Sequence, residues 1–245
     1  MLIFFLRNYL NSLALFNPKK AGKQAYKIFS RPRKGRLAAE DMLFLETADR
    51  SEVVDYQGFT IQTYFWAGEK PTILLAHGWE SNSARWQRFI EILRAEKYQI
   101  VALDAPAHGN TSSDSFNPKL YAEMLNQVVL KFAPVGFVGH SVGSYTLMFW
   151  RNYFHNSTPS VSSPFFFVLL APTSDNRDIF NKYFHILGLN KRVQNAYYQY
   201  FEEKFGFSPA SVIASDFVKN FKEKALIIHD KDDDVAPYSG SENIH

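Results

Sequence analysis

The stretch Gly136-Phe137-Val138-Gly139-His140-Ser141-Val142-Gly143-Ser144 decides the fold. A short apolar run, Val135 to Val138, is typical of a buried β-strand, and a helix-forming run, Tyr145 to Trp150, follows the serine. Ser141 therefore stands in a G-x-S-x-G motif between a predicted strand and a predicted helix, where a sharp turn can expose a nucleophilic hydroxyl. A plain glycine–serine turn is the alternative, and the rest of the chain decides between the two.

The composition fits a single globular domain with a full core. The chain has 245 residues, of which 46% are hydrophobic and 21% charged. It contains no cysteine, which excludes disulfides, thiolate metal sites and a cysteine nucleophile. No motif implies a cofactor, and we expect none.

Charge is distributed unevenly along the chain. Residues 1–39 contain nine Lys or Arg and no Asp or Glu, whereas the remainder contains 18 basic and 24 acidic residues. An acidic body speaks against nucleic-acid binding. The basic first segment leaves open an electrostatic contact of its own.

Residues 2–16 place apolar side chains at helical spacing, and Asn17-Pro18 ends the run. One interpretation is an amphipathic helix whose cationic neighbours, within residues 1–36, rest weakly on an anionic membrane surface. The other is a helix packed on the body with its lysines solvated. The apolar run before Arg7 is far shorter than the ~18–20 residues that cross a bilayer, and no secretory signal is evident. We therefore expect a cytoplasmic protein.

Strand and helix patterns alternate through most of the chain. Residues 53–66 alternate apolar and polar side chains around Gly58, which predicts an antiparallel hairpin. Continuous apolar runs predict buried parallel strands, and helical patterns separate them. The predicted strands are 72–76, 99–104, 135–138, 165–170 and 225–229, and the predicted helices are 83–95, 118–132 and 143–154. The expected fold class is α/β, with a mostly parallel sheet, an N-terminal antiparallel hairpin and helices on both faces.

The alternation breaks in a stretch rich in aromatic residues, about 173–222. We predict two or three helices here, forming a small lid inserted at the carboxyl edge of the sheet, where ligands bind. An ordinary helical layer with an aromatic core is the alternative. The expected domains are a basic amphipathic segment, 1–39, and a body, 40–245, that contains this insertion.

From about Val53 to its end, the chain resembles the α/β-hydrolase superfamily, in particular its serine esterase- and lipase-like bacterial members. His77-Gly78-Trp79 is similar to the oxyanion-hole turn of that fold, and Asp104-Ala105-Pro106-Ala107-His108-Gly109 is similar to its next loop, with Ala107 where glycine is usual. Gly139 to Gly143 is similar to the nucleophile elbow. His229 to Pro237 is similar to the loop that supplies the triad acid.

The resemblance implies a serine hydrolase that cleaves a small carboxylic ester or related acyl substrate. It implies Ser141 as the nucleophile, Asp233 as the acid, and the backbone N–H groups of Trp79 and Val142 as the oxyanion hole. Asp230, Asp232 and Asp234 compete with Asp233, and Asp232 is its nearest rival. The four aspartates lack the pattern of a calcium loop, so we expect no metal.

The histidine that would complete the triad is not identifiable. The order in this superfamily is serine, acid, histidine, with a helix and a strand between the last two. Only twelve residues follow Asp233, whereas a helix and a strand need roughly 16–18. We therefore expect the final helix and strand to be missing, the histidine to lie beyond residue 245, and the chain as given to show weak or no turnover. A non-catalytic protein that uses the same scaffold for binding is the alternative.

Overall fold

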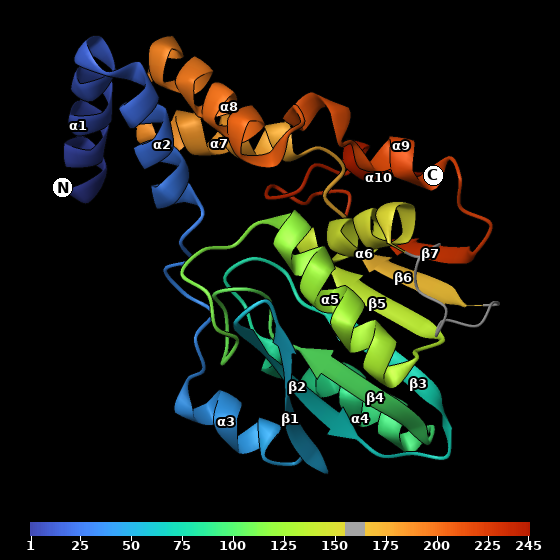
Figure 1. Ribbon diagram of the computed structural model, residues 1–245. Coiled ribbons are helices and arrows are strands. Elements are labelled where there is room, and N and C mark those ends of the chain that lie inside the picture. The colour runs from blue at the N-terminus through green and yellow to red at the C-terminus, as the bar shows by residue number, and fades with distance from the viewer. Residues whose placement is uncertain (155–164) are drawn as a thin grey trace. The chain divides into compact units, whose positions relative to one another are not determined.

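Two units make up the chain in the computed structural model, which describes residues 1–154 and 165–245. Unit 1 combines Met1–Arg31 with Asp175–Asp216, and unit 2 combines Pro32–Ser174 with Phe217–His245. The N-terminal segment and a segment from the later part of the chain, blue and orange in Figure 1, therefore lie together in unit 1. The stretch around Ser141 belongs to unit 2.

Unit 2 is built on a seven-stranded sheet with the order β1-β2-β4-β3-β5-β6-β7. The strands are β1 (Arg50–Tyr56), β2 (Phe59–Trp66), β3 (Lys70–Ala76), β4 (Tyr98–Leu103), β5 (Gly136–His140), β6 (Phe166–Leu170) and β7 (Lys224–Ile228). The β1–β2 and β2–β4 pairs are antiparallel, and the other pairs are parallel. This confirms the predicted α/β fold with its antiparallel N-terminal hairpin.

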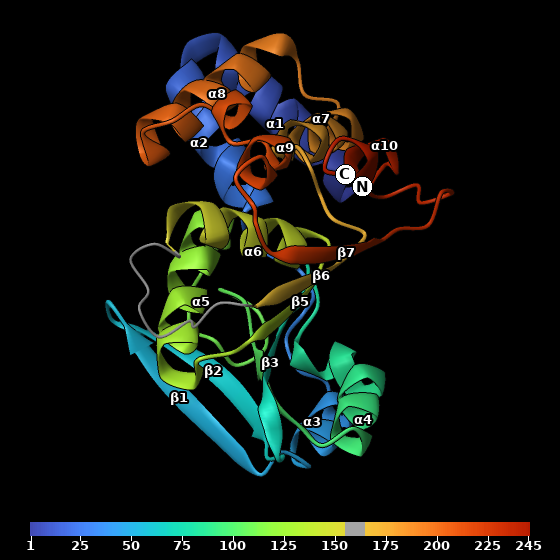
Figure 2. The same ribbon diagram turned by 90° about the vertical axis from the view of Figure 1, so that its right-hand side faces the viewer.

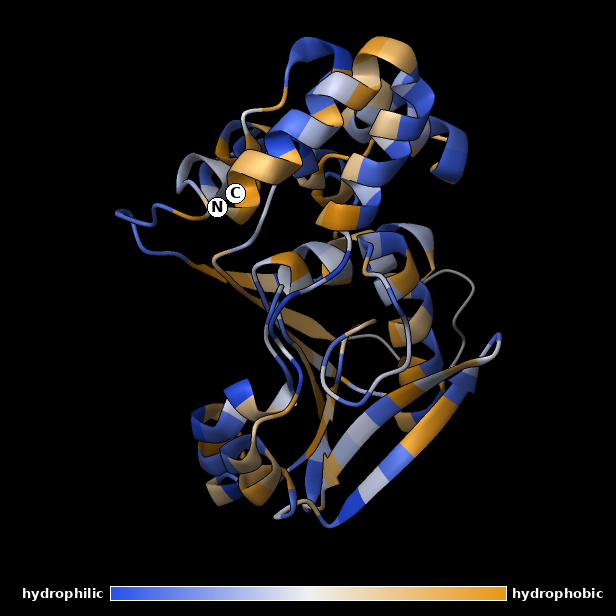
Figure 3. Cartoon of the chain, turned by 90° about the vertical axis from the view of Figure 1, so that its left-hand side faces the viewer, coloured by the Kyte–Doolittle hydropathy of each residue, from blue (hydrophilic) through white to orange (hydrophobic). Residues whose placement is uncertain are grey.

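The hydropathy of each strand follows its position in the sheet. The hairpin of β1 and β2 alternates between hydrophilic and hydrophobic residues in Figure 3, whereas the central strands are continuously hydrophobic. The exposure agrees, because β1 is half-buried at every second residue while Ile73 to Ala76 of β3 are all buried. An edge hairpin keeps one face in water, and a central parallel strand is covered on both faces.

Helices cover both faces of the sheet, as predicted. They are α3 (Ala39–Leu45), the 3-10 turn η1 (Ser83–Trp86), α4 (Gln87–Ala95), α5 (Pro118–Phe132), α6 (Val142–Tyr153) and α10 (Ser239–Glu242). In Figure 2, α5 and α6 lie on one face and α3 and α4 on the other. The core on the α6 face includes Phe137 of β5, whose ring stacks on Trp150 of α6 at 5.0 Å between centroids. This packing fixes α6, and with it the turn that precedes α6, against the centre of the sheet.

Unit 1 consists of helices around an aromatic core. They are α1 (Leu2–Phe16), α2 (Pro18–Phe29), α7 (Asn176–Leu187), α8 (Lys191–Phe205) and the 3-10 turn η3 (Pro209–Ser211), and α9 (Ala214–Val218) contains the boundary between the units. The core gathers Tyr26 of α2 with Phe180, Phe184, Tyr197 and Phe201 of α7 and α8. The aromatic residues of the predicted insertion are thus largely core residues of unit 1.

Helix α1 is fastened to the turn between α7 and α8. The Arg7 side chain donates to the Leu187 carbonyl at 3.1 Å, and the Asn11 side chain donates to the Gly188 carbonyl at 3.0 Å. Leu10 and Ala14 of α1 are fully buried. One face of the N-terminal helix therefore packs on other helices of the same unit.

Helix α2 was not predicted, because its lysines dominate the sequence and three of its four buried residues, Ala21, Gly22 and Ala25, are small. Asn17 caps it by accepting a hydrogen bond from the Lys20 N–H, and Pro18 occupies its first turn. Gly22 meets the backbone of α8 so closely that an added Cβ would lie 2.2 Å from the Ala196 carbonyl oxygen. The absence of a side chain at Gly22 therefore sets the spacing of α2 and α8.

We expect Gly22→Ala to lower the free energy of unfolding of unit 1 by about 1–3 kcal/mol. Helix propensity alone would favour alanine by about 1 kcal/mol, so a net loss reports the clash with the Ala196 carbonyl. Chemical denaturation of the wild type and the variant measures the change. Lys20→Ala, at an exposed position of the same helix, is the control, and equal stability of Gly22→Ala and the wild type would contradict the prediction.

Candidate functional site

Ser141 lies on a strained turn between β5 and α6. Its backbone has φ 54° and ψ −121°, a left-handed conformation that costs a residue with a side chain of the order of 1–2 kcal/mol. The Ser141 N–H donates to the Leu170 carbonyl of β6 at 2.9 Å, which ties the turn to the neighbouring strand. Val142 is the first residue of α6, so its N–H is among those that a helix leaves unsatisfied.

Gly143 brings the start of α6 against the end of β3. A Cβ added at Gly143 would lie 2.2 Å from the Ala76 carbonyl oxygen and 2.6 Å from the His77 carbonyl oxygen. No other residue type fits this approach. The second glycine of the motif therefore lets the helix N-terminus reach the loop that follows β3.

The turn His77-Gly78-Trp79 lies beside the serine. A Cβ added at Gly78 would be 3.2 Å from the Ser141 Cβ and 3.0 Å from the His140 Nδ1 atom. The Trp79 ring packs edge-on against His108 and Phe116, with centroids 5.3 Å away in both cases. The turn that contains Trp79 therefore lies next to Ser141, and Val142 follows Ser141 in the chain.

His77 and His108 hold the loops around the site. The buried His77 ring donates from Nδ1 to the Gly78 carbonyl at 2.7 Å and accepts the Ala105 N–H at Nε2, at 2.9 Å. The His108 ring accepts the Glu80 N–H at Nε2, at 2.9 Å. Burial lowers the pKa of each ring to about 4, so both imidazoles are neutral at pH 7.

Asp104 is a buried anchor for the same loops. Its carboxylate accepts hydrogen bonds from the Ser83 N–H at 2.9 Å, the Ser83 hydroxyl at 2.7 Å and the Asn110 N–H at 2.9 Å. Burial raises the pKa of Asp104, and these donors oppose that rise. The carboxylate therefore joins the loop after β4 to η1.

Asp233 differs from the three aspartates around it. Its Oδ1 accepts the N–H groups of Val235 and Ala236, both at 2.8 Å, and its Oδ2 lies 3.5 Å from the His229 Nε2 atom. The pKa of Asp233 lies below its ordinary value, chiefly because its carboxylate accepts the Ala236 N–H. The Val235 N–H and the His229 ring lower this pKa further. Asp230, Asp232 and Asp234 are exposed, whereas Asp233 is half-buried.

The sequence did not reveal the role of His229 in the loop that carries Asp233, because His229 reads as the polar end of an apolar strand. Its side chain is completely buried. Its Nδ1 atom is 2.6 Å from the Ser241 hydroxyl, and its Nε2 atom is 2.9 Å from the Ala236 carbonyl oxygen. The ring therefore clamps the loop that carries Asp233 to α10.

Two charges act on His140, the residue before Ser141. Burial, with a smaller contribution from Arg85, lowers the pKa of His140 to about 4, and Asp233 opposes this. Among the residues that the structure describes, the His140 Nδ1 atom is buried without a hydrogen-bond partner. Asp233 and Arg85 therefore both contribute to the electrostatic field beside Ser141.

None of the described histidine rings forms a hydrogen bond with the Ser141 hydroxyl. His77, His108 and His229 are engaged with loop backbone, and His185 and His245 are exposed. His155 lies outside the described residues.

Over residues 1–154 and 165–245, no three His, Asp or Glu side chains are grouped as metal ligands. None of the helices in the same residues is long and apolar enough to cross a membrane.

A family model described as the alpha/beta hydrolase family matches residues 73–238, which include Ser141, Asp233 and the turn His77-Gly78-Trp79. A comparison with curated proteins gives no match.

Solved structures with the same fold have diverse activities. A bacterial membrane phospholipase A has a TM-score of 0.57 at 18% identity, over 80% of this chain and 74% of the other. The thioesterase domain of the curacin biosynthetic pathway has a TM-score of 0.56 at 13% identity, over 80% and 87%. Mouse alpha/beta hydrolase domain-containing protein 10 has a TM-score of 0.57 at 14% identity, over 80% and 83%. At these identities the similarity shows the fold alone.

We expect His229→Ala to lower the free energy of unfolding of unit 2 by about 2–4 kcal/mol, because it leaves a cavity and removes the partners of the Ser241 hydroxyl and the Ala236 carbonyl. Chemical denaturation measures the loss. His185→Ala, at an exposed position of α7, is the matched control and should change stability by less than about 0.5 kcal/mol. Similar values for the two variants would refute a clamp at His229.

The stability of unit 2 should fall as the pH is lowered from 6.5 towards 4. His77, His108 and His140 have an ordinary pKa of 6.5, which burial lowers to about 4 in the folded protein. Between these values the unfolded chain binds protons that the folded chain does not, at about 1.4 kcal/mol per pH unit for each proton. Denaturation at several pH values measures the slope. His140→Gln should reduce the proton uptake by about one, and a flat profile from pH 6.5 to 5 would contradict the burial argument.

Proposed function

Because the chain belongs to the α/β-hydrolase family, we propose that it is a serine hydrolase that cleaves a carboxylic ester or a related acyl compound. The observation that carries the proposal is the backbone of Ser141, held at φ 54° at the start of α6, with the Gly78 turn beside it. A strained serine at a helix N-terminus, with a glycine turn next to it, suits attack on a carbonyl. The phospholipase and thioesterase names among the similar structures agree with an acyl substrate.

The proposed first step forms an acyl-enzyme. The Ser141 oxygen attacks the carbonyl carbon, a base takes the hydroxyl proton, and the carbonyl oxygen becomes an oxyanion. The N–H groups of Trp79 and Val142 would stabilise that oxyanion, and removal of one such donor costs about 2.7–4 kcal/mol in a serine protease. Collapse of the tetrahedral intermediate expels the alcohol or thiol, which takes the proton back. Water then attacks the acyl group in the same way and frees Ser141.

The base in this proposal is a histidine oriented by Asp233. The lowered pKa of Asp233 keeps the carboxylate ionised at pH 7, as an acid that supports an imidazolium must be. The family order places this histidine after the acid in the sequence. His140 is a poor candidate, because its ring belongs to the residue before the nucleophile and its Nδ1 atom lies against Gly78.

A second candidate function is binding without catalysis. It is favoured by one observation: within the described residues no histidine ring is bonded to the Ser141 hydroxyl. In that case the same turn would hold an acyl compound without cleaving it.

Reaction with a fluorophosphonate probe distinguishes the two functions. The protein is isolated as its host produces it, treated with the probe, digested and analysed by mass spectrometry. We expect an adduct on Ser141 that is absent in Ser141→Ala and retained in Ser144→Ala, whose buried hydroxyl bonds to the Leu170 carbonyl. Hydrolysis of short-chain thioesters and p-nitrophenyl esters should fall by about 10³-fold or more in Ser141→Ala and Asp233→Asn. An unlabelled Ser141 with no ester turnover would favour the binding protein.

A further inference from the structure

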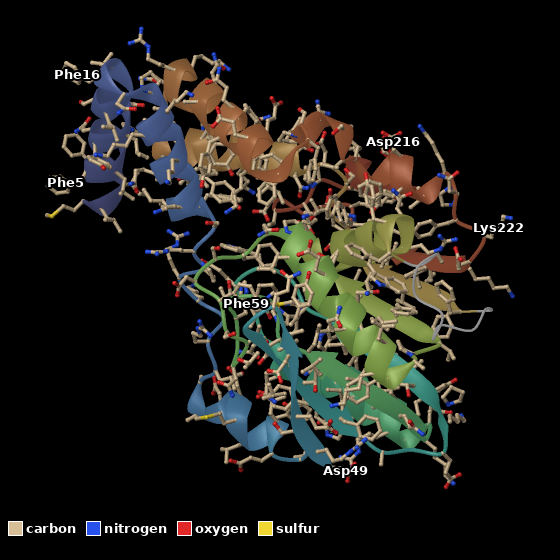
Figure 4. All side chains as sticks on the ribbon, in the orientation of Figure 1. Phe5, Phe16, Asp49, Phe59, Asp216 and Lys222 are labelled. Carbon is tan, nitrogen blue, oxygen red and sulfur yellow. The ribbon has the colours of Figure 1, made fainter. Side chains whose placement is uncertain are left out.

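Helix α1 has a second apolar face, and none of the helices in the described part of the chain covers it. Its inner face buries Leu10 and Ala14, but Phe5 is 61% exposed and Phe16 is 87% exposed. These two phenylalanines are about three turns apart on one side of the helix, and both lie on the side away from α2 in Figure 4. Other large apolar residues exposed on α1 are Leu2, Ile3, Phe4, Tyr9 and Leu15.

Arg7 is the one charged side chain of α1, and it is bound to the Leu187 carbonyl. Besides Arg7, the exposed polar residues of α1 are Asn8 and Ser12, and the others are apolar or aromatic. Large apolar side chains exposed together on one helix are typical of a surface that contacts a partner, so this face indicates a partner. With 15 residues, α1 is too short to cross a bilayer but long enough to lie in its interface.

Unit 1, to which this face belongs, is cationic. Residues 1–31 contain six Lys or Arg and no Asp or Glu, and unit 1 as a whole contains eleven basic and five acidic residues. Lys19 and Lys20 begin α2, three and four positions after the exposed Phe16. An ion pair holds Lys19 to Glu203, whereas Lys20, Lys23 and Lys27 form none with the described residues.

Three of the ammonium groups gather on α2 and α8. Burial, and then the charges of Lys23 and Lys27, lower the pKa of Lys204, whose Nζ atom lies over the Tyr26 ring at 5.4 Å from its centroid. Like charges brought together in this way destabilise a fold unless an anion neutralises them. Arg33 and Arg36 do not belong to this group, because they bond to Glu80 and to the carbonyls of Gly109 and Thr111 in unit 2.

We propose that unit 1 binds an anionic lipid surface, with the Phe5–Phe16 face of α1 inserted among the lipids and the lysines of α2 and α8 on their headgroups. Apolar insertion and electrostatic attraction together are the two contributions that hold an interfacial helix on a membrane. A dimer through the same face is disfavoured, because it would bring together two units that each carry an excess of six positive charges.

Co-sedimentation with vesicles tests the proposal. The full chain is mixed with vesicles of phosphatidylcholine alone and with vesicles in which about a third of the lipid is phosphatidylglycerol. We expect binding to the anionic vesicles that saturates, that weakens as salt is raised from 0.05 to 0.5 M, and that is at least about tenfold weaker on phosphatidylcholine. Wild-type protein that stays in the supernatant with anionic vesicles at low salt would overturn the proposal.

Two pairs of surface variants separate the apolar and the cationic contributions. Phe5→Ser with Phe16→Ser should weaken binding by about tenfold or more, and Lys23→Ala with Lys27→Ala by about fivefold for each lysine. The matched controls are Leu43→Ser on α3, which is 70% exposed, and Lys224→Ala on β7, and both should bind as the wild type does. Equal binding by the wild type and the phenylalanine variant would also refute the proposal.

Sedimentation velocity provides the competing outcome. A wild-type dimer that becomes monomeric in Phe5→Ser with Phe16→Ser, without vesicle binding by either, would assign the face to a second copy of the chain and overturn the lipid proposal. The thermal melting of the variants checks that they fold. The comparison of salts and lipids uses the wild type alone, so it does not depend on the folding of any variant. None of these measurements depends on ester turnover, so the failure of the proposed catalytic function would leave their outcome unchanged.

Discussion

The left-handed backbone at Ser141 is the constraint on which the arrangement of unit 2 depends. The strain is sustained because three adjacent strands hold the turn: β5 leads into it, the Leu170 carbonyl of β6 receives its N–H, and the end of β3 meets Gly143. A single hydrogen bond contributes about 1 kcal/mol, which is comparable to the cost of the backbone strain. The serine therefore stays on its turn because the parallel sheet fixes all three contacts at once.

Buried polar groups, each with its partners, shape the loops around this turn. Asp104 joins the loop after β4 to η1, and neutral His77 and His108 rings bridge the loops after β3 and β4. His229 performs the same role in the loop of Asp233. Loops with no regular backbone ladder must satisfy their N–H and carbonyl groups with side chains, and short polar residues at strand ends do this at little entropic cost.

The two units differ in what stabilises them and in their charge. Unit 2 is organised by its sheet and carries a small net negative charge, whereas unit 1 combines an aromatic core with an excess of cations. In unit 1 the hydroxyls of Tyr26 and Tyr197 are buried without hydrogen-bond partners among the described residues. Burial of an unpaired hydroxyl lowers the free energy of unfolding, so this aromatic core is less stable than a fully apolar one would be. A unit that leaves one helix face apolar and uncovered is suited to contact with another surface.

The sequence by itself determined the strands, most helices of unit 2 and the motif around Ser141, because continuous apolar runs, hairpin alternation and glycine spacing are local signals. Its resemblance to a known loop also pointed to Asp233 among four neighbouring aspartates. Only the tertiary structure showed that the Asp233 carboxylate accepts the N–H groups of Val235 and Ala236, and revealed His229 as the clamp of that loop. It alone joined α1 and α2 to α7 and α8, since their contacts span more than 150 residues of sequence. Pairing of this kind depends on which buried faces fit together in space, and the local pattern of a helix specifies its own apolar face but not the partner that covers it.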